Sequence, residues 1–139
     1  SMRFRASIDG AARGNPGPAG AGVFVEPEHG RPALEFYEPL GSATNNVAEY
    51  RALLLALERA EEAGADEVEI RSDSRLLVEQ MHGTFKMRAE HLKPLLADAV
   101  LRAKRFRKFS ISHIPREQNM KADRLANKGA DASEKSARF

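Results

Sequence analysis

Four acidic side chains occur at places from which a fold could bring them together. Asp9 and Asp73 each follow a short strand-like segment, while Glu49 and Asp123 each lie near the start of a helical segment. Carboxylates crowded within a few ångströms repel one another, so such a group takes up protons or binds cations. Mg²⁺ and similar hard cations prefer oxygen ligands and keep waters that a phosphate oxygen can replace. The four acids therefore predict a divalent-metal site, with a nuclease as the leading interpretation.

Each acid also has an ordinary structural interpretation. At 100° per residue, Glu49 falls about 40° from Leu53, on the face of its helix that we expect to be buried. A buried carboxylate usually has a partner or a cation, although a first-turn acid can also act as a cap or face the helix dipole. Asp73 is an N-cap candidate, Asp123 is another first-turn acid, and Asp9 could form a turn. No single acid decides between the interpretations.

The elements that would position these acids are those of an α/β fold. Antiparallel strands are expected first, and the later alternation of strands and helices predicts parallel neighbours joined by right-handed crossovers. Residues 10–20 are rich in Gly and Pro and predict a rigid turn region. The expected strands are residues 3–8, 21–25, 33–40, 68–72 and 109–114, and the expected helices are residues 45–64 (capped by Asn45 or Asn46), 74–81, 92–105 and 120–130. The pattern predicts a mixed five-stranded sheet with helices packed on it.

Composition is that of an ordinary globular protein. The 139 residues are 42% hydrophobic and 30% charged, and they include no cysteine, which excludes disulfides and thiolate metal sites. We expect one domain over residues 1–139, with residues 1–2 as a remnant of tag removal and residues 131–139 as a frayed polar tail. No apolar run of membrane-spanning length and no secretory leader are seen, so we expect a cytoplasmic protein without membrane contact. A monomer is the default, and no obligate protein partner is evident.

A basic cluster, defined as Arg102, Lys104, Arg105, Arg107 and Lys108, interrupts an otherwise balanced charge of +2. Such a cluster can approach phosphates. It can equally be a solvated cationic helix end that the helix dipole favours. The sequence leaves both interpretations open.

Four segments of the chain resemble the ribonuclease H family, type 1, in its compact bacterial and archaeal branch. They are residues 8–20 (IDGAARGNPGPAG), residues 44–53 (TNNVAEYRAL), residues 72–74 (SDS) with 78–81 (VEQM), and residues 114–127 (IPREQNMKADRLAN). The resemblance implies the ribonuclease H fold, with sheet order 3-2-1-4-5 and only the second strand antiparallel. It also implies that Asp9, Glu49, Asp73 and Asp123 hold two Mg²⁺ or Mn²⁺ ions and catalyse hydrolysis of the RNA strand of RNA/DNA hybrids. The products would carry 5′-phosphate and 3′-hydroxyl ends.

The same resemblance implies a set of residues that bind the hybrid. Asn15, Asn45 and Asn46 would contact its sugars and the DNA phosphate, Thr44 would supply a phosphate-pocket hydroxyl, and Gly10 and Ser74 belong to the matching segments. Neutral amides suit this task because they can sense a 2′-hydroxyl without reading base sequence. The alternative is that Asn15 forms a turn and the asparagine pair caps a helix.

Three departures from the family pattern limit the transfer of roles. The Trp-bearing basic protrusion of some members is absent, so Lys86, Arg88 and the basic cluster are possible substitutes for it. Arg75 stands where many relatives have Gln. Many relatives carry a loop His here. Gapless matching from Asp123 puts His113 in its place, whereas matching of the Ile-Pro-Arg-Glu segment leaves His113 in the strand and offers Arg116 or Glu117, of which we favour Arg116.

Competing functions belong to other classes. A silent hybrid-binding domain would need the fold but not the acids. A junction resolvase or transposase core would share the acids but not the Gly-Asn-Pro-Gly and Thr-Asn-Asn segments. The chain could also be a ribonuclease H domain excised from a larger polypeptide.

Overall fold

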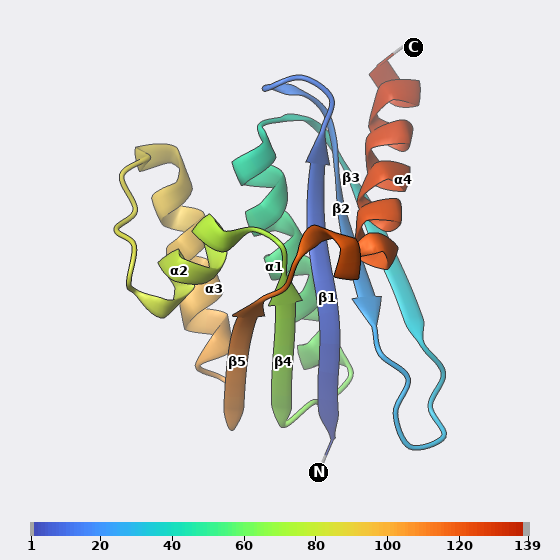
Figure 1. Ribbon diagram of the computed structural model, residues 1–139, viewed down its shortest axis with the longest axis vertical. Coiled ribbons are helices and arrows are strands. Elements are labelled where there is room, and N and C mark those ends of the chain that lie inside the picture. The colour runs from blue at the N-terminus through green and yellow to red at the C-terminus, as the bar shows by residue number, and fades with distance from the viewer. Residues whose placement is uncertain (1, 138–139) are drawn as a thin grey trace.

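A five-stranded mixed sheet forms the centre of the structure, a computed structural model that describes residues 2–137 (Figure 1). Its strand order is β3-β2-β1-β4-β5. The β1/β2 and β2/β3 pairs are antiparallel, whereas the β1/β4 and β4/β5 pairs are parallel. The predicted order and the antiparallel second strand are therefore confirmed. Ser1 of the expected tag remnant and residues 138–139 of the expected tail lie outside the described residues.

The helices and strands follow the predicted order. The strands are β1 (Arg3–Ala12), β2 (Gly17–Val25), β3 (Leu34–Ala43), β4 (Glu67–Ser72) and β5 (Lys108–His113). The α-helices are α1 (Asn45–Glu62), α2 (Arg75–His82), α3 (Lys93–Ala103) and α4 (Met120–Ala137), with short 3₁₀ turns at Glu90–Leu92 and Arg116–Gln118. Within residues 2–137, none of the helices combines the length and the apolar character needed to cross a membrane.

Helices α1 and α4 cover opposite faces of the sheet. A Cβ placed on Gly10 would meet the backbone of α1, whereas a Cβ on Gly22, which lies opposite Asp9 in the next strand, would meet the backbone of α4. Successive residues of a strand point to opposite faces, so the two helices sandwich β1 and β2. The predicted inner stripe of α1 is buried, with Leu53 and Leu57 in the hydrophobic core.

Two segments expected to be irregular are regular. Strand β2 begins at Gly17, inside the predicted turn region, and the register of β2 and β3 shifts between Ala19 and Gly20. Helix α4 continues to Ala137, so the prediction of a frayed tail from residue 131 is wrong for the described part of that segment. The reason is a buried contact: Ser133 Oγ donates to Ala19 O at 2.6 Å and accepts from the backbone amides of Leu40 and Gly41. The tail of the helix thus satisfies polar backbone groups at the irregularity.

The helix caps differ from those expected. Thr44, not Asn45 or Asn46, is the N-cap of α1, and Ser74, not Asp73, is the N-cap of α2. Glu49 is the fifth residue of α1 and lies beyond its first turn. The capping interpretation is therefore wrong for Asp73, and Glu49 is too far along its helix to cap it.

Strand β5 is one border of the sheet. His82, the last residue of α2, places Nε2 at 2.7 Å from the carbonyl oxygen of Ile111 in this strand. The described start of the chain is also tied to the sheet, because Met2 N donates to Asp66 Oδ2 at 3.0 Å. Met2, which the sequence interpretation had set aside as part of a tag remnant, therefore contributes to the fold.

Candidate active site

Three carboxylates from three elements meet where β1 and β4 approach their carboxyl ends. One carboxylate oxygen from each of Asp9, Glu49 and Asp73 lies within 4.8 Å of the others. Asp9 comes from β1, Glu49 from α1, and Asp73 from the connection between β4 and α2. They line an open cleft of about 540 Å³. The distances permit one cation to contact all three side chains, and the all-oxygen donor set suits a hard divalent metal.

The same cleft contains most of the other predicted site residues. Asp123, in the first turn of α4, is close enough to hydrogen-bond with the Asp9 carboxyl, although it is not part of the tight group of three. The remaining lining residues are Gly10, Ala11, Ala12, Asn45, Asn46, Ser74, Arg116 and Asn127. The structure thus brings all four predicted acids to one place, beside amide groups and one arginine.

Burial and mutual repulsion make these acids hold protons unusually well. Burial raises the pKa of Asp9 to about 8, with further contributions from the negative charge of Asp73 and the hydrogen bond with Asp123. Burial likewise raises the pKa of Glu49 well above its usual value, helped by the charges of Asp9 and Asp73. Glu49 Oε2 is also buried without a hydrogen-bond partner among the described residues. A bound cation would relieve both the repulsion and the missing contact, so the residues fit a divalent metal.

Gly10 permits the acids to come this close. A Cβ at this position would lie 2.3 Å from the carbonyl carbon of Ala48 and 2.4 Å from Glu49 N, distances that only an absent side chain can accommodate. The Gly10 amide also hydrogen-bonds to the carboxylates of Asp9 and Glu49, which partly offsets their raised pKa values. Its role in the site is therefore backbone contact rather than side-chain chemistry.

Asn119 is a buried residue of the site whose role the sequence interpretation missed. Its Nδ2 donates to Ile8 O at 2.9 Å and to Asp73 Oδ2 at 3.0 Å, and the residue is 1% exposed. It thus joins β1 to the acid that follows β4. The available signal was its position directly before the last helix, within the segment that resembles the family.

The polar residues expected to bind substrate also have structural partners. Asn15 Oδ1 accepts from Asn45 N at 3.0 Å, which fixes the turn after β1 against the start of α1. Thr44 Oγ1 accepts from Val47 N, and Ser74 Oγ accepts from Leu77 N. The side chains of Asn15, Asn45 and Asn46 are exposed, so their amide groups are available to a ligand.

A family model described as reverse transcriptase-like matches residues 7–129. The N-terminal RNase H domain of Rv2228c from Mycobacterium tuberculosis, solved as a fusion with maltose-binding protein, superposes with a TM-score of 0.90 at 42% identity, over 99% of each chain. The chain belongs to the ribonuclease H (reverse transcriptase-like) family. This confirms the resemblance seen in its motifs.

Two further comparisons describe the extent of the ribonuclease H likeness. The bifunctional protein Rv2228c itself is 43% identical over 137 residues, which are 98% of this chain but only 38% of that protein. A structure of LC11-RNase H1 in complex with RNA/DNA hybrid gives a TM-score of 0.85 at 41% identity, over 94% of this chain and 98% of that one. The chain therefore spans under two fifths of the first relative and nearly all of the second.

Some residues predicted for this ribonuclease H site lie outside the acidic cleft. His113 ends β5 with an exposed side chain and is not among the lining residues, whereas Arg116 is. Arg75 is exposed at the start of α2 and does not line the cleft either. Lys86 and Arg88 line a neighbouring groove, which shares Asn46 with the acidic cleft. The geometry favours Arg116 over His113 as the residue beside the acids.

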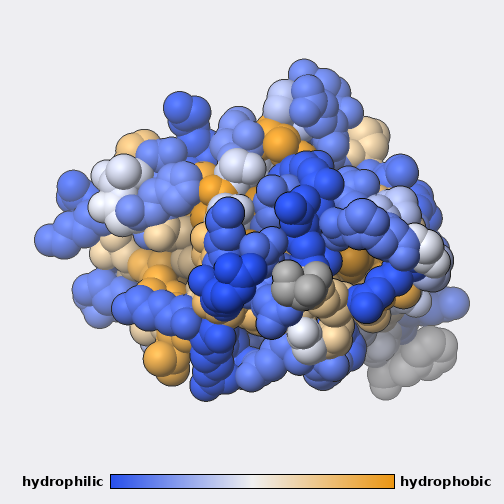
Figure 2. Space-filling view, turned by 90° about the horizontal axis from the view of Figure 1, so that it is seen from below, coloured by the Kyte–Doolittle hydropathy of each residue, from blue (hydrophilic) through white to orange (hydrophobic). Residues whose placement is uncertain are grey.

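The basic cluster lies at the opposite end of the sheet. Lys108 opens β5 beside Glu67, about 17 Å along the strand from the level of Ser72. Arg105 donates to Glu61 at 3.4 Å and Arg107 to Glu67 at 2.7 Å. Figure 2 views this end, where hydrophilic residues predominate and an apolar patch lies on the side of α3 and β5. The cluster is therefore a partly paired surface feature at the end of the sheet away from the acidic cleft.

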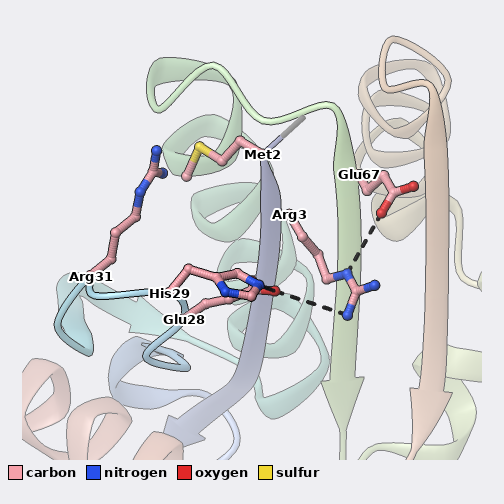
Figure 3. A pocket seen from close by; sticks show the side chains of 6 residues that line it. All are labelled: Met2, Arg3, Glu28, His29, Arg31 and Glu67. Carbon is pink, nitrogen blue, oxygen red and sulfur yellow. Dashed lines mark ion pairs between the residues drawn. The ribbon is translucent and has the colours of Figure 1, made fainter.

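A second cavity at this far end has a different character. It measures about 250 Å³ and is lined by Met2, Arg3, Glu28, His29, Arg31 and Glu67 (Figure 3). Arg3 lies 4.0 Å from Glu28 and 3.6 Å from Glu67, so the acids here are paired with a cation. Unlike the cleft around Asp9, this cavity has no group of closely spaced carboxylates.

Proposed function

We propose that the chain is an endoribonuclease that hydrolyses the RNA strand of RNA/DNA hybrids with two Mg²⁺ or Mn²⁺ ions. The observation that carries the proposal is the meeting of Asp9, Glu49 and Asp73 within 4.8 Å, with Asp123 in the same cleft. Membership of the ribonuclease H family and the likeness to a relative solved with RNA/DNA hybrid support the choice of substrate.

The four acids are the proposed ligands of the metal ions. When bound, the ions would activate a water molecule and stabilise the departing 3′ oxygen. The chain's own contribution is to hold the acids ready: Asn119 fixes Asp73, and the Gly10 amide donates to Asp9 and Glu49. Because the pKa of Asp9 is about 8, loading the site displaces protons, so metal affinity should rise with pH up to about that value.

The amides beside the acids are the proposed hybrid-binding groups. Asn45 and Asn46 line the cleft at the start of α1, and Asn15, in the turn between β1 and β2, accepts from Asn45 N, so all three amides can contact sugar hydroxyls and phosphate. Arg116 is exposed at the cleft and can approach the phosphate next to the cleaved bond. We assign Thr44 and Ser74 mainly to capping, with hydroxyls that can still donate to a ligand, and give Arg75, Lys86 and His113 peripheral roles.

A monomer is proposed as the working state. A single domain and a cytoplasmic location are further proposals. The 38% span of Rv2228c keeps open the proposal that this unit belongs to a longer polypeptide.

A cleavage panel tests the proposal. Labelled RNA/DNA hybrid, duplex RNA, duplex DNA and a four-way junction are incubated with the protein in Mg²⁺, Mn²⁺ or EDTA. We expect metal-dependent cutting confined to the RNA strand of the hybrid, with 3′-hydroxyl products. Asp73→Asn should lower cleavage by about a hundredfold or more while hybrid binding persists, because it removes ligand charge and keeps shape.

The matched control is Asp98→Asn, which changes an exposed acid paired with Arg102 at 3.1 Å, outside the cleft. It should cleave like the unmodified protein. Hybrid binding without any cutting would support a silent binding domain instead, and cutting of the junction would support another nuclease class.

A further inference from the structure

Arg13, the first residue after β1, directs its guanidinium to the last turns of α4. Its Nη1 lies 2.5 Å from Asp131 Oδ1 and 2.7 Å from Glu134 Oε2. Its Nη2 donates to the side-chain and backbone oxygens of Asn127 at 3.3 and 3.4 Å. One planar group thus contacts three residues of α4, a fork geometry that fixes orientation better than a single ion pair does.

The turn that follows Arg13 is closed tightly. Arg13 N donates to Pro18 O at 2.9 Å, Gly14 has φ of +98°, and a Cβ on Gly17 would lie 1.8 Å from Arg13 O. These contacts join the two ends of the turn next to the last pair of the β1/β2 ladder, Ala12 and Ala19. A shift of Arg13 is therefore passed on to the turn that it opens.

Asn15 lies within this turn and connects it to the start of α1. Its Oδ1 accepts from Asn45 N at 3.0 Å, and Asn45 lines the acidic cleft. Besides the strand pairing at its two ends, the turn has two side-chain attachments to helices: Arg13 to α4, and Asn15 to α1. Without the attachment to α4, the hydrogen bond of Asn15 to Asn45 N would be the remaining side-chain contact of the two.

We propose that Arg13 is a positioning residue for hybrid recognition: anchored by Asp131 and Glu134, it holds the turn that presents Asn15 to the substrate. The last turns of α4 thereby serve substrate binding without touching the substrate. The inference rests on the proposed function, because it takes RNA/DNA hybrid as the ligand of Asn15.

Charge and exposure argue for positioning rather than simple stabilisation. The side chains of Arg13, Asp131 and Glu134 are 34%, 67% and 44% exposed. Ion pairs this exposed contribute little to folding stability. Their convergence on one guanidinium, next to the turn that carries Asn15, bears on the position of that turn more than on the stability of the whole fold.

The test compares Arg13→Gln with the double variant Asp131→Asn/Glu134→Gln and with the combination of all three changes. KM and kcat for RNA/DNA hybrid are measured well below the unfolding temperature, together with hybrid affinity in EDTA by fluorescence anisotropy. We expect each variant to raise KM and Kd by about threefold to tenfold, with kcat changed less than about twofold. The combined variant should show no further increase, because all three changes break the same attachment.

Arg124→Gln is the matched control. Arg124 also joins α4 to the sheet, through Glu35 at 2.7 Å, but it does so at β3 and not at the turn. Arg124→Gln should leave KM unchanged. If its KM rose as much as that of Arg13→Gln, the cause would be a general loosening of α4, and the proposal would be overturned.

Two further results would also overturn it. An unchanged KM with a lowered unfolding temperature would show that Arg13 only stabilises the fold, and additive effects would show that Arg13 touches the hybrid itself. The anisotropy measurement separates this inference from the proposed function, because it reports on hybrid binding even if the unmodified protein cleaves nothing.

Discussion

Replacement of Asp9 by Asn should stabilise the metal-free protein while abolishing its cleavage. Asp9 is 5% exposed, and burial together with the neighbouring acids raises its pKa from 3.8 to about 8. Between pH 3.8 and about 8, the Asp9 carboxyl thus keeps a proton in the folded chain that it has already released in the unfolded chain. The contribution of Asp9 to stability is most favourable below pH 3.8 and is lost as the pH rises to about 8.

The size of the effect follows from that difference. A change of one in pKa corresponds to about 1.4 kcal/mol. At pH 7 the relevant interval runs from 3.8 to 7, which sets an upper bound of roughly 4 kcal/mol. Since the neighbouring acids share the proton, we expect about half of this, or about 2 kcal/mol. Asn keeps the size of Asp and needs no proton, so Asp9→Asn should gain this amount in free energy of unfolding.

Urea unfolding in EDTA at pH 5, 7 and 8.5 measures the effect. The gain of Asp9→Asn should grow with pH, and added Mg²⁺ should stabilise only the unmodified protein, because ligand that binds the folded state alone raises its stability. Glu69→Gln is a control of opposite sign: burial raises the pKa of Glu69, but the contacts from Arg5 and Arg71 outweigh it and lower the pKa overall. If Asp9→Asn were no more stable than the unmodified protein at pH 8.5, then burial and the neighbouring acids would not destabilise the Asp9 carboxylate, and the reasoning would be refuted.

Two further variants test individual contacts. Asn119→Ala should lower the free energy of unfolding, measured in urea, by roughly 2 to 4 kcal/mol, because Ile8 O and Asp73 lose their buried donor. Its effect on kcat should vanish when Asp73 is already replaced by Asn. An equal effect on kcat with and without Asp73→Asn would contradict the link between Asn119 and Asp73. Ser133→Ala should lower the free energy of unfolding by about 2 kcal/mol with cleavage retained, because Ala19 O loses its partner at 2.6 Å; unchanged stability would show that the contact is dispensable.

The residue pattern predicted a mixed five-stranded sheet and the buried face of α1, whereas the strand order and the grouping of the four acids were implied by the resemblance to the ribonuclease H family. The alternation of apolar and polar residues in β1 and the apolar stripe of α1 indicate which face of each element is buried. Glu49 was informative because a carboxylate on the buried face of a helix needs a hydrogen-bond partner or a cation. Its neighbour Leu53 is fully buried in the structure, as the helical spacing requires.

What the sequence did not predict depends on contacts between distant segments. Ser133 appears in a polar stretch, and only its long-range bond to Ala19 shows why α4 continues. Arg13 likewise gives no local sign of its partner Glu134, 121 residues away. Helix caps were misassigned because Thr44 and Asn45, like Asp73 and Ser74, are adjacent residues of similar capping propensity, and backbone geometry decides between them.

The contact of His82 with β5 has a consequence for the exposed edge of the sheet. A border strand offers unpaired carbonyl and amide groups, and an approaching extended peptide would use them to lengthen the sheet. By occupying the Ile111 carbonyl, His82 withdraws one of these contacts from β5. One carbonyl of this edge is therefore already paired within the chain, in a strand that contains neither a proline nor a bulge.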